Sequence, residues 1–306
     1  MKVLVTGGAG FLGSHVVDAF LAQGHEIAIV DHWQKNKKRF IPEGVHIVKH
    51  SIASKEAREF VAEFKPELVC HLAAQISVPF SVAHPAEDAR INIVDAIGFL
   101  HACAEAGAKK IIYTSTCGVY GKSPDLPLNE ESPRIPESPY ALSKYALEEY
   151  LWYLRDMYGL QAIVFRPANA YGPRQQFAGE AGVVAIFLNH ILKGTEAKVF
   201  GDGSATRDLL YAQDLARAFV LAAESRYQGV LNIGTGVEKT VKELWETLSD
   251  IHGQDTYVEY VAPRPGDIYR SYLDYSRAKE MIGWEPEIHF EEGLRRTYDW
   301  FKEHGI

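Results

Sequence analysis

Tyr140 and Lys144 lie four residues apart in the segment Tyr-Ala-Leu-Ser-Lys, a spacing that puts two side chains on one face of a helix. A positive charge beside a phenol favours the phenolate and lowers a tyrosine pKa from its usual value of about 10. Tyr140 is therefore a candidate general base, with Lys144 as the cation that activates it. The same pattern recurs at Tyr275 and Lys279, so spacing alone does not choose between the two pairs.

Thr116 favours the first pair. It ends the run Ile-Ile-Tyr-Thr-Ser-Thr, whose apolar and β-branched residues are typical of a buried strand. A hydroxyl at the end of such a strand lies at the carboxyl edge of a parallel sheet, where this architecture binds its ligands. Tyr275 and Lys279 lie near the C-terminus without a comparable partner. We predict Thr116, Tyr140 and Lys144 as the catalytic residues.

A glycine-rich turn, Thr-Gly-Gly-Ala-Gly-Phe-Leu-Gly, follows the first apolar run and opens the first helical pattern. Gly7, Gly10 and Gly13 permit a tight turn, the close approach of a pyrophosphate and the packing of helix on strand. The unpaired N–H groups and the positive dipole end of a helix attract that pyrophosphate. The segment predicts a dinucleotide-binding site.

Asp31 ends the second predicted strand. A carboxylate there accepts hydrogen bonds from the ribose hydroxyls of adenosine and repels the extra phosphate of NADP, so we predict NAD as the cofactor. The alternative is that the basic run that follows binds a phosphate instead of forming a solvated loop; its residues are Lys35, Lys37, Lys38 and Arg39.

Short apolar runs alternate with segments of helical periodicity, which predicts an α/β fold with a doubly wound parallel (Rossmann) sheet. The runs are continuous, as expected for strands that are buried on both faces. The expected strands are 2–6, 26–30, 45–48, 67–71, 110–114 and 162–165. The expected helices are 10–23, 53–64, 86–106 and 138–158.

After about residue 168, glycine and proline become frequent and the elements become shorter and less regular. We therefore expect a smaller C-terminal α/β substrate domain. Residues 1–168, with about 209–235, are assigned to the NAD-binding domain, because a helix near 211–225 and a strand at 230–234 are expected to return to it. The substrate domain comprises about 169–208 and 236–306.

Composition excludes some classes of function. The chain has 306 residues and a net charge of −8, whereas a nucleic-acid-binding protein usually carries a basic face. Three cysteines without framework spacing indicate reduced thiols and a cytoplasmic location. No apolar run reaches the roughly eighteen residues of a membrane span, and the twelve histidines show no metal-ligand spacing. We expect no nucleic acid, no membrane and no metal.

Several motifs together resemble the extended short-chain dehydrogenases, and within them the UDP-glucose 4-epimerase group, over essentially the whole chain. The motifs lie at 6–13, 31, 71–74, 92, 115–121, 140–144, 166–174, 200–203, 207–208 and 264–267. The resemblance implies that Tyr140 takes the proton of a sugar 4-hydroxyl while C4 gives a hydride to NAD, and that Thr116 hydrogen-bonds the same oxygen. The 4-keto sugar then turns over and receives the hydride on its other face.

The resemblance also implies the binding residues. NAD is expected to contact Gly7, Gly10, Phe11, Leu12, Gly13, Asp31, Ala73, Tyr140 and Lys144. The nucleotide sugar, a UDP-hexose such as UDP-glucose or UDP-galactose, is expected to contact Thr116, Asn169, Arg207, Arg264, Asp267 and Ser271. The helices 86–106 and 138–158 are expected to pair with their copies in a homodimer.

Related activities remain as alternatives. Sugar 4,6-dehydratases and glucuronate decarboxylases carry a glutamate two residues after the catalytic Thr or Ser, whereas Cys117 and Gly118 follow Thr116 here. We interpret Cys117 as a packing residue. UDP-glucuronate 4-epimerases tend to carry Arg-Pro-Asp-Met where this chain has 176–180, which favours a neutral sugar. A non-catalytic NAD-sensing scaffold would usually lack the tyrosine or the lysine.

Overall fold

The computed structural model describes residues 1–32, 40–176, 182–263 and 268–305. Its main feature is a seven-stranded sheet with the strand order β10-β6-β5-β4-β1-β2-β3, in which every pairing is parallel. The strands are β1 Lys2–Thr6, β2 Glu26–Val30, β3 His46–Val48, β4 Leu68–His71, β5 Lys110–Thr114, β6 Gln161–Pro167 and β10 Gly229–Ile233. The prediction of a doubly wound parallel sheet is confirmed.

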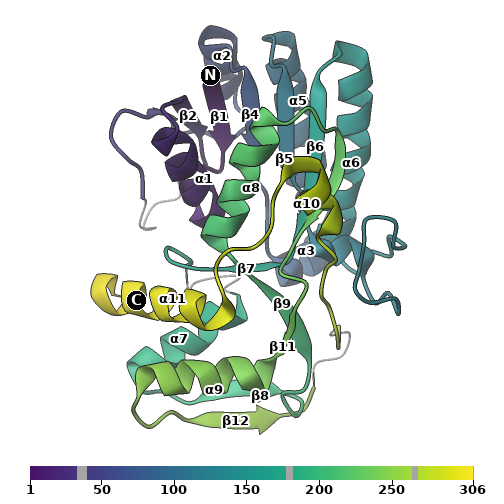
Figure 1. Cartoon of the computed structure of the whole chain (residues 1–306). Helices are drawn as coiled ribbons and strands as arrows, with labels where there is room; N and C mark the ends of the chain where they lie inside the picture. The colour runs from purple at the N-terminus through teal and green to yellow at the C-terminus, as the bar shows by residue number, and fades with distance from the viewer. Residues whose placement is uncertain (33–39, 177–181, 264–267, 306) are drawn as a thin grey trace.

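Helices cover both faces of this sheet (Figure 1). One face carries α2 (Lys55–Phe64), α5 (Ala96–Glu105) and α6 (Pro139–Tyr158), and the other carries α1 (Phe11–Ala22) and α8 (Ala212–Glu224). Along β1, Leu4 faces the first layer whereas Val3 and Val5 face the second. This two-sided burial explains why the strands read as continuous apolar runs.

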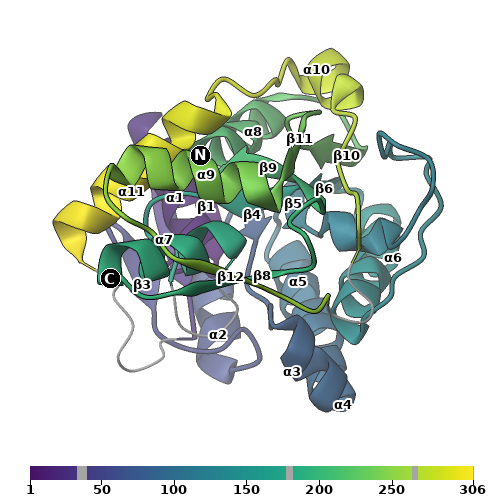
Figure 2. The same ribbon diagram turned by 90° about the horizontal axis from the view of Figure 1, so that it is seen from below.

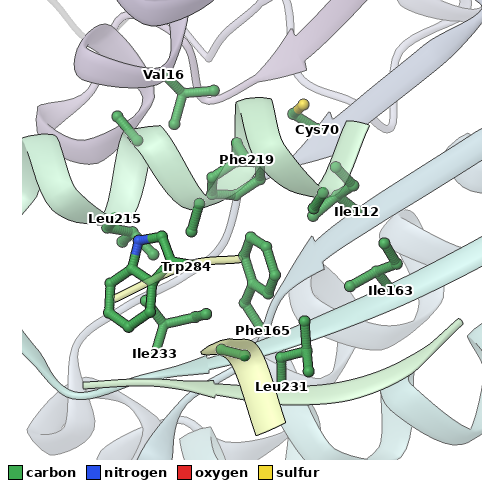
Figure 3. Packing of buried hydrophobic residues seen from close by; sticks show 14 of the residues in the cluster. Val16, Cys70, Ile112, Ile163, Phe165, Leu215, Phe219, Leu231, Ile233 and Trp284 are labelled. Atoms are coloured by element: carbon green, nitrogen blue, oxygen red, sulfur yellow. The ribbon is translucent and has the colours of Figure 1, made fainter. Parts of the chain in front are cut away.

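The face beneath α1 and α8 has a core assembled from distant parts of the chain (Figure 3). Phe219 of α8 packs edge-on against Phe165 of β6, with ring centroids 5.0 Å apart. Trp284 follows the short helix α10 (Ser276–Ile282) and is fully buried in the same cluster. Its indole Nε1 donates to the Asp214 carbonyl oxygen at 2.8 Å. The late segment around α10 therefore helps to close this face.

The helix expected at 86–106 is divided into three parts. It consists of α4 (Pro85–Ala89), a π-helical turn η1 (Arg90–Asp95) and α5, and the short helix α3 (Val78–Ala83) precedes it. Helices α3, α4, α5 and α6 lie together at one end of the molecule (Figure 2). A π turn inserts one residue into the helical register and is frequent near functional sites.

A second, smaller layer lies beyond the carboxyl edge of the sheet (Figure 1). It contains the sheet β11-β9-β7 and the pair β12-β8, with helices α7 (Val183–Lys193), α9 (Val241–His252) and α11 (Phe290–His304). The strands are β7 Asn169–Tyr171, β8 Ala197–Phe200, β9 Thr206–Tyr211, β11 Glu238–Thr240 and β12 Val258–Val261. This layer has an apolar core of its own around Trp245 and Leu294. In the described part of the chain, no helix is long and apolar enough to cross a membrane.

Candidate active site

Thr116 and Tyr140 meet at the carboxyl edge of the sheet. Thr116 follows β5 and caps the short 3-10 helix η2 (Cys117–Tyr120), where its hydroxyl oxygen accepts the Gly118 N–H at 3.1 Å. Tyr140 lies in the first turn of α6, whose start is fixed by Ser138, which accepts the Ala141 N–H at 3.1 Å. The Thr116 hydroxyl lies close enough to the Tyr140 phenol to lower the pKa of that phenol.

Lys144 lies one helical turn after Tyr140 and is almost completely buried. Its ammonium is 4.5 Å from the centroid of the Tyr113 ring of β5, and the Tyr113 hydroxyl donates to the Lys144 carbonyl oxygen at 3.2 Å. Burial lowers the pKa of Lys144 to about 7, against the opposing effect of Glu148 and Asp88. The lysine is therefore close to losing its charge near neutral pH.

Burial shifts the pKa of Tyr140 in the opposite direction, upwards. Loss of solvent raises the pKa of the phenol above its ordinary value, and the hydrogen bond from Thr116 partly offsets the rise. Deprotonation of Tyr140 thus depends on positive charge and hydrogen-bond donors within the site.

The competing pair, Tyr275 and Lys279, has a different environment. The Tyr275 ring packs edge-on against Trp284, with centroids 6.0 Å apart. The Lys279 ammonium is 2.6 Å from a Glu285 carboxylate oxygen at the surface. In neither contact does the Lys279 ammonium act as an activating cation beside the Tyr275 phenol.

The glycine-rich turn has the form that a dinucleotide pyrophosphate requires. Gly7 has a φ of +68°, and a Cβ at Gly13 would overlap the Gly7 carbonyl oxygen. No side chain caps the start of α1 at Gly10, so the N–H groups of the first turn, including those of Phe11 and Leu12, are not covered by a capping side chain. These features fit bound NAD.

Asp31 and Ala73 border this turn. Asp31 follows β2 and accepts the Ala9 N–H at 3.1 Å, so its carboxylate lies beside the loop. The Ala73 N–H donates to the Thr6 hydroxyl at 3.1 Å, and a Cβ at Gly7 would lie 3.0 Å from the Ala73 nitrogen. The turn therefore lies closely against the end of β4.

Three predicted substrate residues are grouped around β9. Asn169 is paired with Leu209 across β7 and β9, and the Ser271 carbonyl oxygen accepts the Asp208 N–H at 2.9 Å. The Arg207 guanidinium donates to the Thr206 carbonyl oxygen at 2.7 Å.

Cys117 connects this group to Thr116. The Asn169 side-chain oxygen is 3.9 Å from the Cys117 sulfur, next to Thr116. Burial raises the pKa of the Cys117 thiol to about 11, so the thiol is protonated at neutral pH.

A cavity of about 960 Å³ lies next to this group, in the smaller layer. It contains three aromatic side chains and both charge signs, which suit a stacked base and polar contacts. Its lining residues are Phe200, Gly201, Asp202, Ala205, Lys242, Tyr260, Val261, Pro263, Ile268 and Tyr269. The sequence analysis singled out the motif at 200–203 but had no signal for Lys242, Tyr260 or Tyr269.

Several predictions lie outside the described residues. Arg264 and Asp267 of the predicted substrate site are among them. So are the basic run Lys35, Lys37, Lys38 and Arg39 and most of the segment 176–180, on which the comparison with glucuronate epimerases depends.

Comparison with known proteins places this geometry in a family. The model of the NAD dependent epimerase/dehydratase family matches residues 3–234. The chain belongs to this family. A UDP-glucose 4-epimerase of Mycolicibacterium smegmatis is 42% identical, with 99% of each chain covered. The expected resemblance to the UDP-glucose 4-epimerase group is thereby confirmed.

Solved structures of the family have the same architecture. The Thermotoga maritima UDP-glucose 4-epimerase, solved with UDP-glucose, superposes with a TM-score of 0.95 at 43% identity, covering 99% of both chains. A UDP-N-acetylglucosamine 4-epimerase of Methanobrevibacter ruminantium, solved with UDP-N-acetylmuramic acid, gives 0.93 at 37% identity, again covering 99% of both chains.

A buried polar network next to Thr116 was missed by the sequence analysis. Both oxygens of Glu148 bind the Arg166 guanidinium, at 2.6 and 3.1 Å, and Ser115 donates to Glu148 at 2.5 Å. Arg166 also donates to the Tyr120 hydroxyl at 3.1 Å. The sequence feature that could have indicated this network is the position of Glu148, four residues after Lys144 on one helix.

Proposed function

We propose that this protein is an NAD-dependent 4-epimerase of a UDP-hexose, interconverting UDP-glucose and UDP-galactose through a transient 4-keto sugar. The observation that carries the proposal is that Thr116, at the end of β5, and Tyr140, in the first turn of α6, lie together, with Lys144 buried one turn away at the sheet edge that also carries the glycine-rich turn. Full-length relatives named UDP-glucose 4-epimerase support the same reaction.

In this mechanism Tyr140 accepts the proton of the sugar 4-hydroxyl and later returns it. Thr116 donates a hydrogen bond to the same oxygen and orients it. Lys144 supplies positive charge that favours the Tyr140 phenolate. When bound, NAD supplies a reversible hydride acceptor at C4. We assign its binding to Gly7, Gly10, Phe11, Leu12, Gly13, Asp31 and Ala73, together with Tyr140 and Lys144.

The substrate side is assigned in two parts. Arginine forks bind pyrophosphate through planar, charge-assisted hydrogen bonds, which we assign to Arg207 and Arg264, with Asn169 and Asp267 as further contacts of the nucleotide. The aromatic cavity around Phe200 fits the base. This assignment divides the chain into an NAD-binding domain (1–168 and about 209–235) and a nucleotide-sugar domain (about 169–208 and 236–306).

The sugar range includes N-acetylated hexoses. Ser271 has a small side chain, and its backbone pairs with Asp208 beside Arg207. A serine there leaves space for an acetamido group, which a large side chain would fill. The UDP-N-acetylglucosamine 4-epimerase among the relatives supports this range.

We also propose a cytoplasmic homodimer. Helix α6 exposes Tyr150, Tyr153 and Met157, and the adjoining η1 turn exposes Val94 at 63% of its surface. Large exposed apolar patches on helices favour pairing with a copy of the same face. All three cysteines are free thiols, which suits a reducing compartment.

Incubation with UDP-galactose and separation of the products tests the reaction. Tyr140→Phe removes the general base, and we expect turnover to fall by about 10²–10⁴-fold while nucleotide-sugar binding survives. Tyr275→Phe is the matched control, because it changes the other tyrosine of the same spacing. Full turnover in Tyr140→Phe, or loss of turnover only in Tyr275→Phe, contradicts the assignment.

A further inference from the structure

Asp88 is a buried carboxylate that the reaction as described does not use. It lies in α4, directly before the π turn, and has 0% of its surface exposed. Its Oδ1 accepts hydrogen bonds from Gln75 at 2.7 Å and from Asn92 at 3.2 Å. Its Oδ2 is buried and has no hydrogen-bond partner among the described residues. Burying a charged carboxylate costs free energy unless a cation lies nearby.

Lys144 is a buried cation of this site. Arg166, a second buried cation nearby, is bound by both oxygens of Glu148, and one of those oxygens also accepts Ser115. Glu148 is therefore already neutralised by Arg166. Lys144, Arg166, Glu148 and Asp88 form a buried set of two cations and two carboxylates, in which Asp88 is the carboxylate that Arg166 does not bind.

The remaining titratable groups that act electrostatically around Lys144 and Asp88 carry no negative charge in the resting site. They are His71 of β4, Tyr113 of β5, and Tyr140 of α6 itself. Burial lowers the pKa of His71 to about 3, so its ring is neutral. Burial raises the pKa of both tyrosines. The two carboxylates that act on Lys144 are Glu148, which also binds Arg166, and Asp88 of α4.

The π turn fixes Asp88 relative to the catalytic helix. Asn92 lies within this turn, and its side-chain nitrogen is 3.1 Å from the Ser143 hydroxyl, next to Lys144 in α6. The Asn92 side-chain oxygen accepts the Gln75 N–H at 2.8 Å. Gln75 and Asn92 therefore hold the Asp88 carboxylate in a defined position against α6.

We propose that Asp88 is the counterion of Lys144 and a positioning residue for the epimerisation, acting through Lys144 on Tyr140 without touching the substrate. Its negative charge keeps the buried lysine protonated, and the protonated lysine sustains the phenolate. The kinetic part of this inference rests on the proposed function, whereas the charge pairing itself does not.

The pH profile of kcat in the holoenzyme tests the kinetic part with Asp88→Asn, which keeps an acceptor for Gln75 and Asn92 but removes the charge. The two limbs of this pH profile report the two pKa values of the Tyr140–Lys144 pair. Removing a nearby negative charge lowers both pKa values. We expect both limbs to move to lower pH, by about one unit for a charge at this range. Glu87→Gln, which alters the adjacent exposed carboxylate of α4, leaves both limbs in place.

Thermal unfolding of four proteins tests the pairing independently of activity: the wild type, Asp88→Asn, Lys144→Met and the double variant, near pH 6. In the wild-type background Asp88→Asn removes a counterion and lowers Tm. In the Lys144→Met background it removes an uncompensated buried charge and raises Tm. This reversal of sign is the expected result, and the double variant remains informative even where Asp88→Asn alone is too unstable to purify.

Two results overturn the inference. One is an Asp88→Asn enzyme that loses turnover equally at every pH, because that is a purely structural effect. The other is a destabilisation by Asp88→Asn that is the same with and without Lys144. An absence of epimerase activity in the wild type would instead contradict the proposed function, and the unfolding cycle would still decide the pairing.

Discussion

Tyr140 and Lys144 are both shifted by burial towards their uncharged forms, although proton transfer requires a phenolate beside an ammonium. A hydrogen bond from Thr116 and the carboxylates around Lys144 offset part of this cost. The positive charge of an oxidised nicotinamide would offset more. We therefore expect that bound NAD, through this positive charge, favours the reactive ionisation state of the proposed acid–base pair.

Sugar selectivity is predicted to depend on the side chain at 271. Ser271→Tyr places a ring where an acetamido group would lie, and overpacking of about 1–3 kcal/mol corresponds to a roughly 5–150-fold loss of kcat/KM for UDP-N-acetylglucosamine. Turnover of UDP-galactose is expected to stay near the wild-type value. Steady-state kinetics with both sugars provide the measurement.

Ser271→Ala is the control, because it leaves the space open and should spare both sugars. If the wild type does not turn over UDP-N-acetylglucosamine, or if Ser271→Tyr turns it over as fast as the wild type, the residue does not limit the pocket.

Spacing along the sequence was enough to put Tyr140 and Lys144 on one helix and Thr116 at a strand end, and the structure has them there. Their roles, and those of the binding residues, stay predictions. Asp88 was not predicted, because its significance depends on burial and on the balance of charges contributed by separate elements. Such a balance exists only after α4, α6 and the sheet have packed together.

Among the secondary-structure elements, those with long apolar patterns were predicted well and the others were not. The six expected sheet strands occur within a residue or two of their predicted positions. The helix at 86–106 contains a π turn, which a single helical period does not describe, because one inserted residue shifts the register by about 100°. Strands of three residues, such as β7 and β11, are too short to carry a pattern.

Helix α8 is terminated by a lysine from another element, and this contact predicts a stability effect. Lys110 of β5 is buried, and its ammonium donates to the carbonyl oxygens of Ala222, Ala223 and Ser225 at 2.9, 2.8 and 2.6 Å. A cation at a helix C-terminus satisfies unpaired carbonyls and opposes the dipole. Lys110→Met should lower the free energy of unfolding by about 1.5–3 kcal/mol, measured by urea denaturation.

The neighbouring Lys109 is the matched control. Its side chain is 77% exposed, and its ammonium is 3.6 Å from Glu67, so Lys109→Met should change stability by less than about 1 kcal/mol. Equal effects of the two substitutions would show that the cap at α8 contributes nothing specific.

For the whole molecule, buried histidines predict acid sensitivity. Burial lowers the pKa of His15 to about 4 and that of His71 to about 3, below the unfolded value near 6.5. Between these values the unfolded chain binds more protons than the folded one, so stability falls as pH falls from 6.5. At pH 5 each histidine is expected to have lowered the free energy of unfolding by about 2 kcal/mol. Urea unfolding at pH 7 and pH 5 measures this difference.

Replacing one histidine identifies its share of this dependence. His15→Gln keeps a donor for the Pro173 carbonyl oxygen, which lies 3.0 Å from the ring nitrogen, and removes the titrating group. The difference in stability between pH 7 and pH 5 should shrink by about 2 kcal/mol, whereas His50→Gln, at an exposed site, should leave it unchanged. An unaltered pH dependence in His15→Gln would refute the explanation.

The proposed homodimer predicts that light scattering gives twice the mass of the 34.2 kDa chain at micromolar concentration. Tyr153→Glu should shift the protein towards monomer, because it places a charge in the apolar face of α6. Tyr257→Glu, at a comparably exposed tyrosine outside that helix, is the control. A wild type that is monomeric at this concentration would contradict the proposal.

Helix α8 packs against α1, although about 190 residues of chain synthesis separate the two elements. During translation, α1 and β1 leave the ribosome early, and the apolar side of the sheet beneath α8 stays uncovered until residues 212–224 have emerged. At the usual rate of about 5–20 residues per second, this interval is on the order of ten seconds or more. The nascent chain therefore presents a hydrophobic surface for the time in which chaperones act, and its yield in cells should depend on them more than its final stability suggests.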